Sequence, residues 1–269
     1  MKAGDWVGGK YRLGLELSRS EDWIRFAVEE PAQPQLELVL PMQHALLRPN
    51  VRDAFLAFKT PEHPSILPTL DEGVQDGVPW RVRPRSRGPL SRRLSVSEAF
   101  SLGAALAPAV LAMGERLGGR IPVDQITWTL DGQPVMAPTG IPPSPGAMQN
   151  LPAAQGESEA LAVLLYTVVE GRPPRAGEYR PSGAGTEDLG LLLMDLCNGS
   201  RDARREALVN LGKRVMAPVE PAVLAPRPPP RSLHSLFPVP IPAWFVVVQP
   251  GQIDDVARAN VARQSGVEP

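Results

Sequence analysis

The stretch QITWTLDGQPVMAPTGI, residues 125–141, predicts two short strands joined by a tight turn. The strands are expected at 126–130 and 133–137 around Asp131-Gly132, because Asp-Gly between apolar runs is the strongest short hairpin signal. Hairpins followed by a glycine-containing elbow often carry catalytic groups. Yet residues 132–156 contain no Asp, Glu, His, Cys, Lys or Arg. The stretch therefore has the frame of a catalytic element without its charged chemistry.

Before this hairpin the sequence is typical of strands. Apolar and polar residues alternate at 11–18 and 23–30 like the two arms of a hairpin, and 35–42 predicts a further strand. A short helix is expected at 51–59. Asp76-Gly77 lies between two apolar runs, which indicates another hairpin.

From Pro89 onward the sequence is typical of helices. Ser95 and Glu98 form a capping box that opens an apolar helix through Met113. Three further helices are expected, at 157–170 before Gly171, at 187–197 with Thr186 as its cap, and at 202–215. In the first of these three, Leu164, Leu165 and Val168 are expected in the core.

Composition excludes several classes of protein. The chain has 269 residues, 43% hydrophobic and 21% charged, with a net charge of −1, so no charge imbalance points to nucleic acid or a membrane surface. The start has no apolar signal core, and the apolar stretch 102–113 is too short to span a bilayer. The single cysteine, Cys197, and three scattered histidines predict no disulfide and no metal site. We expect a cytoplasmic protein without membrane insertion.

Prolines divide the chain. They are dense at 218–242, which predicts an extended, semi-rigid linker after a body of about 217 residues. The tail beyond it predicts a strand at 244–248, beginning with Trp244 and Phe245, and a helix at 253–264. A strand and a helix cannot stabilise themselves. The tail therefore docks on the body, pairs with another chain or opens a further domain.

The order of elements and two motifs resemble the bacterial eukaryotic-like Ser/Thr protein kinases. EHPSILPTLDEGVQDGVPWRV, residues 62–82, is similar to the family's segment from His-Pro-Asn-Ile into its fourth and fifth strands. ALAVLLYTVVEGRPP, residues 160–174, is similar to its Leu-Gly-x-x-Leu-Tyr helix and the stop that follows. The hairpin at 125–141 fits the catalytic loop running into Asp-Phe-Gly. The resemblance covers about residues 4–217 and implies an α+β, two-lobed protein-kinase-like fold.

The resemblance also shows which catalytic groups are missing. Kinases hold phosphates and magnesium with a glycine loop, a strand Lys, a catalytic-loop Asp and Asn, and a second Asp. Those positions correspond here to the glycine-free SRSEDW at 18–23, Val39, Gly118-Gly119-Arg120, Gln125 and Pro138-Thr139-Gly140. Only Gly140 matches, and Asp124 lies one residue from the Asn position. Glu157, at the start of the 157–170 helix, is interpreted as a helix-capping residue.

The sequence therefore predicts a pseudokinase, not an enzyme, that binds no cofactor and serves as a scaffold or regulatory binding module in signalling. The expected domains are a kinase-like N-lobe at 1–88, a helical C-lobe at 89–217, the Pro-rich linker at 218–243 and a strand-helix tail at 244–269. Two alternatives stay open. One is a structural subunit of a larger assembly anchored by the tail, and the other is a residual nucleotide-dependent transferase with a rearranged site.

The partner is expected to be another protein. WRVRPRSRGPLSRR, residues 80–93, is rich in arginine, and alternation along a strand would place Arg81, Arg83 and Arg85 on one face. A solvated face is the alternative to a docking patch for these arginines and Arg87. Few aromatics and a balanced charge argue against nucleic acid. The candidate partner-binding residues are these four arginines with Trp244 and Phe245.

Overall fold

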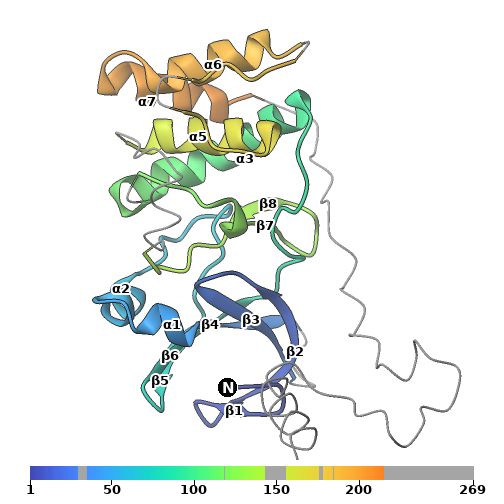
Figure 1. The fold of residues 1–269 in the computed structure, drawn as a ribbon, viewed down its shortest axis with the longest axis vertical. Coiled ribbons are helices and arrows are strands. Elements are labelled where there is room, and N and C mark those ends of the chain that lie inside the picture. The colour runs from blue at the N-terminus through green and yellow to red at the C-terminus, as the bar shows by residue number, and fades with distance from the viewer. Residues whose placement is uncertain (30–34, 118, 143–155, 176–177, 184, 215–269) are drawn as a thin grey trace, which may run out of the picture. The chain divides into compact units, whose positions relative to one another are not determined.

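The computed structural model describes the whole chain except residues 30–34, 118, 143–155, 176–177, 184 and 215–269 (Figure 1). Contacts divide the chain into two units, Met1–Leu224 and Ala225–Pro269. The expected linker at 218–243 and the tail at 244–269 lie outside the described residues. Below, the sheet lobe means described residues up to 88, and the helical lobe means described residues from 89 to 214.

Six antiparallel strands form the sheet of the first lobe. They are β1 (Trp6–Val7), β2 (Tyr11–Arg19), β3 (Trp23–Val28), β4 (Leu36–Pro41), β5 (Asp71–Gln75) and β6 (Val78–Pro84). The sheet order is β1-β2-β3-β4-β6-β5, so β4 and β6 are neighbours although two helices separate them in sequence. The three strands predicted at 11–18, 23–30 and 35–42 are confirmed. So is the hairpin at Asp76-Gly77, where both residues have positive φ, as a tight primed turn requires.

The two faces of this sheet differ in chemistry. Alternate residues, among them Phe26, Leu38 and Val82, form an apolar cluster on one face. The register pairs Val39 with both Arg25 and Arg81, and pairs Glu37 with Arg83. Consequently three arginines and one glutamate share the opposite face.

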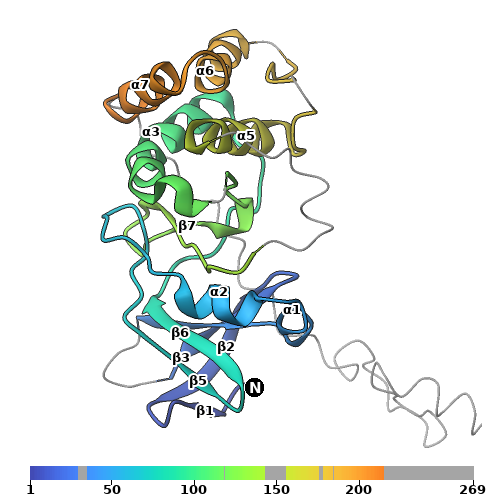
Figure 2. The same ribbon diagram turned by 90° about the vertical axis from the view of Figure 1, so that its left-hand side faces the viewer.

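Two short helices, α1 (Gln43–Leu46) and α2 (Val51–Ala57), follow β4 and lie beside the sheet (Figure 2). The helix predicted at 51–59 is α2, which ends two residues early because Phe58 has an extended backbone. Val51 and Phe55 of α2 pack with Trp23 and Val39 of the sheet.

The predicted hairpin is present as β7 (Ile126–Trp128) and β8 (Pro134–Met136). Its strands are shorter than expected because the turn closes earlier, with Thr129 N donating to Gln133 O and Gly132 N to Thr129 O. Met136 also forms an isolated bridge with Ile66, a residue that precedes β5 in the sheet lobe. The hairpin therefore connects the two lobes, and Figure 1 shows it between sheet and helices.

Four long helices build the other lobe: α3 (Val96–Met113), α5 (Glu157–Glu170), α6 (Glu187–Cys197) and α7 (Arg201–Gly212). The predicted capping box is confirmed, since Ser95 Oγ accepts from Glu98 N and the Glu98 carboxylate accepts from Ser95 N. Thr186 precedes α6 but does not cap it with its side chain, which is a correction. Its hydroxyl donates instead to Pro181 O and Gly183 O.

These helices share one core with the hairpin. Leu164, Leu165 and Val168 are buried in it, as predicted, together with Trp128 of β7. One described helical segment, Val96–Leu117, is long and apolar enough to cross a membrane, but 61% of its apolar window is buried within the protein. A core helix has the same composition, and this burial is what a core position produces.

Candidate functional site

The position expected to carry the strand lysine, Val39, lies in an apolar cluster. Val39 is buried together with Trp23 of β3, Phe55 of α2 and Ile141 of the segment after β8. The cluster joins the sheet, the neighbouring helix and the chain that follows the hairpin. A side chain at this position therefore contacts hydrocarbon, where an unpaired ammonium group would be costly.

Beside Val39, the Glu37 carboxylate is fully buried and held by three residues. Arg83 Nε donates to Oε1 at 2.7 Å, and Arg25 Nη1 lies 3.2 and 3.3 Å from the two oxygens. Ser86 donates through its backbone N–H at 3.0 Å and its hydroxyl at 3.2 Å. Because each carboxylate oxygen has two acceptor sites, these donors leave Glu37 well satisfied.

Burial and the neighbouring charges oppose each other at Glu37. Burial raises the pKa of Glu37, but the guanidinium groups of Arg83 and Arg25 outweigh it and hold the pKa below its ordinary value of 4.5. Burial lowers the pKa of Arg25, and the charge of Glu37 partly offsets this effect. Glu37 is therefore ionised at neutral pH, with two arginines as its counter-charges.

Arg81 and Arg83 extend from β6 to backbone carbonyls of the segment after β8. Arg83 Nη1 donates to Ala137 O at 3.0 Å, and Arg81 Nη1 donates to Thr139 O at 3.2 Å. Arg81 Nη2 also donates to Phe55 O at 2.7 Å and Phe58 O at 2.9 Å, and it pairs with Glu72 at 3.2 Å. Its guanidinium carbon lies 4.6 Å from the centre of the Phe55 ring.

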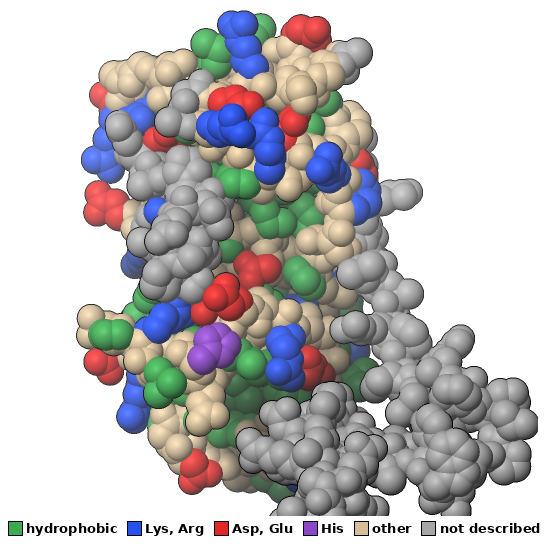
Figure 3. Space-filling model, in the orientation of Figure 1, with side chains coloured by type: hydrophobic (Ala, Val, Ile, Leu, Met, Phe, Trp, Pro, Cys, Tyr) green, Lys and Arg blue, Asp and Glu red, His purple; other side chains and the backbone are tan. Residues whose placement is uncertain are grey.

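These positions correct the interpretation of the arginine run as one exposed face. Arg81 and Arg83 are only 2% and 3% exposed, so neither can contact a docking partner in this structure. Arg85 is half-buried, and the exposed Arg87 donates to Leu130 O. On the face drawn in Figure 3, basic and acidic side chains are interspersed. Trp244 and Phe245 lie outside the described residues.

The turn between β2 and β3, where the resemblance places the glycine loop of a kinase, is held by two residues from other parts of the chain. Asp124, in a short 3₁₀ helix (Val123–Gln125) of the helical lobe, is hydrogen-bonded to the side chains of Ser20 and Trp23. Arg48 pairs with Asp22 at 2.8 Å. Burial raises the pKa of Asp124, and these hydrogen bonds lower it in part. The sequence suggested no partner for Asp124; the fold provides two.

The three residues in the place of Asp-Phe-Gly, Pro138-Thr139-Gly140, take part in packing. Thr139 is 1% exposed; its hydroxyl accepts from Gln125 Nε2 at 3.3 Å and from Ile141 N at 3.2 Å. Gln125, in the position of the magnesium Asn, is therefore engaged with Thr139. Gly140 has φ of +73°, and a Cβ there would overlap the Phe58 side chain.

Replacing Gly140 with alanine is expected to lower the free energy of unfolding by roughly 2 kcal/mol or more, from a left-handed backbone and from overlap with Phe58. Gly9→Ala is the matched control, because Gly9 has φ of +66° and open space around it. It should cost about 1 kcal/mol. Urea unfolding of both variants measures the difference. Equal losses would contradict the close contact at Gly140.

Other reactive groups in the described residues offer no competing site. The half-buried Cys197 has its pKa raised to about 12, mainly by burial and then by Glu159, so its thiol is a poor nucleophile. Within the described ranges no three His, Cys, Asp or Glu side chains gather as metal ligands. Glu157 is the first residue of α5, but Gly156 holds the N-cap position and no side chain caps the helix, so the capping interpretation is corrected to an acidic residue in the first turn. Glu157 lies 3.7 Å from Arg205 of α7.

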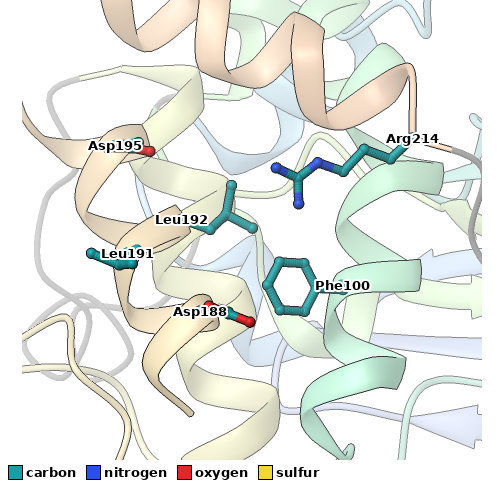
Figure 4. A pocket seen from close by; sticks show the side chains of 6 residues that line it. All are labelled: Phe100, Asp188, Leu191, Leu192, Asp195 and Arg214. Carbon is teal, nitrogen blue, oxygen red and sulfur yellow. The ribbon is translucent and has the colours of Figure 1, made fainter. Parts of the chain in front are cut away.

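One hollow of about 390 Å³ lies away from this region, among α3, α6 and the end of α7. In Figure 4, Phe100, Leu192 and Arg214 point toward one another, with Asp188 and Asp195 along the same helix as Leu192. Its lining combines apolar side chains with opposite charges, and it holds no cluster of catalytic groups. The residues around Val39, Glu37 and the 137–141 segment therefore remain the candidate site.

Comparison with known proteins supports the fold. No family model and no curated protein matches the sequence. Among solved structures, two mutant forms of the Mycobacterium tuberculosis PknI kinase domain match with TM-scores of 0.60 and 0.59 at 20% identity. Each match covers 78% of this chain and 98% or 97% of the kinase domain. These matches, over most of this chain and nearly all of the kinase domain, show that the chain has a protein-kinase-like fold.

Proposed function

We propose that this chain is a catalytically inactive kinase-like protein that acts as a protein–protein scaffold or regulatory binding module. The observation that carries the proposal is the filling of the space between the lobes. Val39, Trp23 and Ile141 occupy it with hydrocarbon. Buried charges occupy the rest, with Arg25 and Arg83 paired with Glu37, and Arg81 paired with Glu72.

The available charges also argue against phosphoryl transfer. That reaction depends on positioned cations and metal ligands that stabilise phosphate charge. Arg25 and Arg83 are already paired with Glu37, and Arg81 is bound to three carbonyls and Glu72. Asp124 faces Ser20 and Trp23 and has no second carboxylate in the 138–140 segment with which to hold magnesium. A scaffold needs none of these groups, because a fold can present surfaces without chemistry.

The chain is accordingly expected to show no stabilisation by magnesium-ATP. A ligand at 100 times its Kd would stabilise a protein by about 2.7 kcal/mol, which is several degrees in melting temperature. Thermal unfolding with magnesium-ATP up to millimolar concentration, and with magnesium alone, measures this directly. An active protein kinase domain serves as the positive control.

A clear rise in melting temperature with magnesium-ATP, absent with magnesium alone, would overturn the inactive assignment. The scaffold role is tested separately by affinity capture of the intact chain from its native cells. A specific protein partner whose capture is unaffected by added magnesium-ATP is the expected result. Failure to capture any partner reproducibly would count against the scaffold role.

A further inference from the structure

The strongest unexplained feature is the direction in which the two β6 arginines point. Both leave the sheet lobe and end on carbonyl oxygens of the segment after β8, Ala137 O for Arg83 and Thr139 O for Arg81. Charge-assisted hydrogen bonds of this kind are stronger than neutral ones, and burial shields them from water. Two such bonds in parallel hold the segment directly against the sheet.

The guanidinium group of each arginine is also bound by groups of the sheet lobe. Arg83 is bound to the buried Glu37, and Arg81 to Glu72 and to Phe55 O and Phe58 O around α2. Neither side chain can swing away without leaving a buried charge unpaired, which costs more than breaking a surface pair. The arginines are therefore rigid connections between the lobes.

Three further contacts close the same interface. Leu67 N donates to Met136 O at 2.8 Å and Met136 N donates to Ser65 O at 2.9 Å, so the hairpin pairs with the chain before β5. Ile141 inserts beside Val39 and Phe55. Asp124 holds the β2–β3 turn on the opposite side. Polar, apolar and backbone contacts thus fasten one lobe to the other without any ligand.

We propose that Arg81 and Arg83 lock the two lobes into a single closed arrangement, so that the partner-binding surface has one constitutive state that no ligand in the cleft switches. This inference rests on the proposed scaffold function. It states how partner binding by the scaffold is regulated. The lobes unfold together because the network belongs to both of them. Control of partner binding must then come from the abundance or modification of the proteins, since opening of the cleft is not available.

The first test uses the unmodified full chain and hydrogen–deuterium exchange in the absence of nucleotide. Amides of Met136 and Leu67, which donate across the lobes to Ser65 O and Met136 O, should exchange as slowly as the β3–β4 amides at the centre of the sheet. Equal protection indicates one cooperative unit. Exchange at Met136 and Leu67 that is a hundredfold faster than in β3 and β4 would overturn the lock.

The second test removes the network without leaving buried charge behind. The variant Arg25→Met/Glu37→Leu/Arg81→Met/Arg83→Met replaces it with apolar side chains, a change that buried ion clusters often tolerate. Calorimetry of the parent should give a single two-state transition, and the variant should give two resolved transitions. Arg12→Met/Arg19→Met, at two half-exposed arginines of the same sheet, should keep one transition.

A single transition in the four-residue variant, or two transitions in the parent, would contradict the lock. If the variant does not fold, the exchange measurement on the parent is sufficient by itself to test the lock. Both tests are independent of nucleotide. If the chain binds magnesium-ATP but shows equal protection, the inactive assignment is refuted and the lock stands. If protection is unequal and ATP does not bind, the lock is refuted and the inactive assignment stands.

Discussion

Replacing Glu37 with glutamine is expected to lower the free energy of unfolding by about 3–5 kcal/mol. Glutamine has the same shape but no charge, so Arg25 and Arg83 would each lose a counter-ion while remaining only 2% and 3% exposed. Ser86 would lose an ionic acceptor as well. Urea unfolding at pH 7 measures the change.

Glu16→Gln is the matched control for this prediction. Glu16 pairs with Arg19 on strand β2 of the same sheet, but both side chains are partly solvated. Surface pairs contribute less than about 1 kcal/mol, so this variant should unfold almost like the parent. Arg25→Met/Glu37→Leu/Arg83→Met should recover most of the stability lost in Glu37→Gln. A Glu37→Gln loss no larger than that of Glu16→Gln would show that the network contributes little.

The ionisation of Glu37 also predicts how the stability of the protein depends on pH. Because the folded pKa of Glu37 lies below its ordinary value of 4.5, its stabilising contribution is complete above that pH. The contribution is lost as the pH falls through the lower folded value, where the protonated acid resembles glutamine. The stability difference between parent and Glu37→Gln should therefore be largest near neutral pH and shrink in acid. A difference independent of pH would contradict ionisation of Glu37 in the folded protein.

Replacing Leu165 with aspartate is expected to cost about 4 kcal/mol or more and to leave the protein insoluble. Leu165 is fully buried in α5, and a Cβ on Gly103 of α3 would lie 2.9 Å from its Cδ1. The same Cβ would lie 3.2 Å from Leu211 of α7, so Leu165 fills the point where three helices meet. A carboxylate there would have no counter-charge, and total stabilities are commonly only 5–15 kcal/mol.

Two substitutions calibrate this result. Leu191→Asp makes the same chemical change on α6, where the side chain is 60% exposed, and should alter stability by about 0.5 kcal/mol or less. Leu165→Met keeps the volume and apolar character and should cost less than about 1.5 kcal/mol. Soluble expression and urea unfolding of the three variants are the measurements. If Leu165→Asp melted like the parent, the packing of α5 in the core would be wrong.

The sequence predicted the local structure well because local signals control it. Alternation at 11–18 and 23–30 specified β2 and β3, and the Ser95–Glu98 capping box specified the start of α3. Asp76-Gly77 specified the β5–β6 turn. These features depend on residues within a few positions of one another, so periodicity and backbone preference suffice. Thr186 is the exception, since its hydroxyl found partners in the preceding loop.

The absence of charged residues from 132 to 156 could also be read from the sequence, because it needs no coordinates. Resemblance placed Val39, Gln125 and 138–140 at positions that the folded chain brings to one region. The sequence could not show which interactions the side chains in this region make instead. Alternation placed Arg81, Arg83 and Arg85 on one face of a strand but could not say whether that face was solvated.

Tertiary structure decided that question through residues distant in the chain. Glu37 lies 46 residues before Arg83, and Thr139 O lies 58 residues after Arg81, yet both are hydrogen-bonded to those arginines. An arginine is buried only where a folded surface supplies acceptors in the correct directions. Those acceptors exist only after β4 pairs with β6 and the 137–139 segment packs against them. The sequence by itself determined the elements and the absence of charge from 132 to 156. Long-range pairing of β4 with β6 and packing of the 137–139 segment turned an apparent surface patch into the buried link between the lobes.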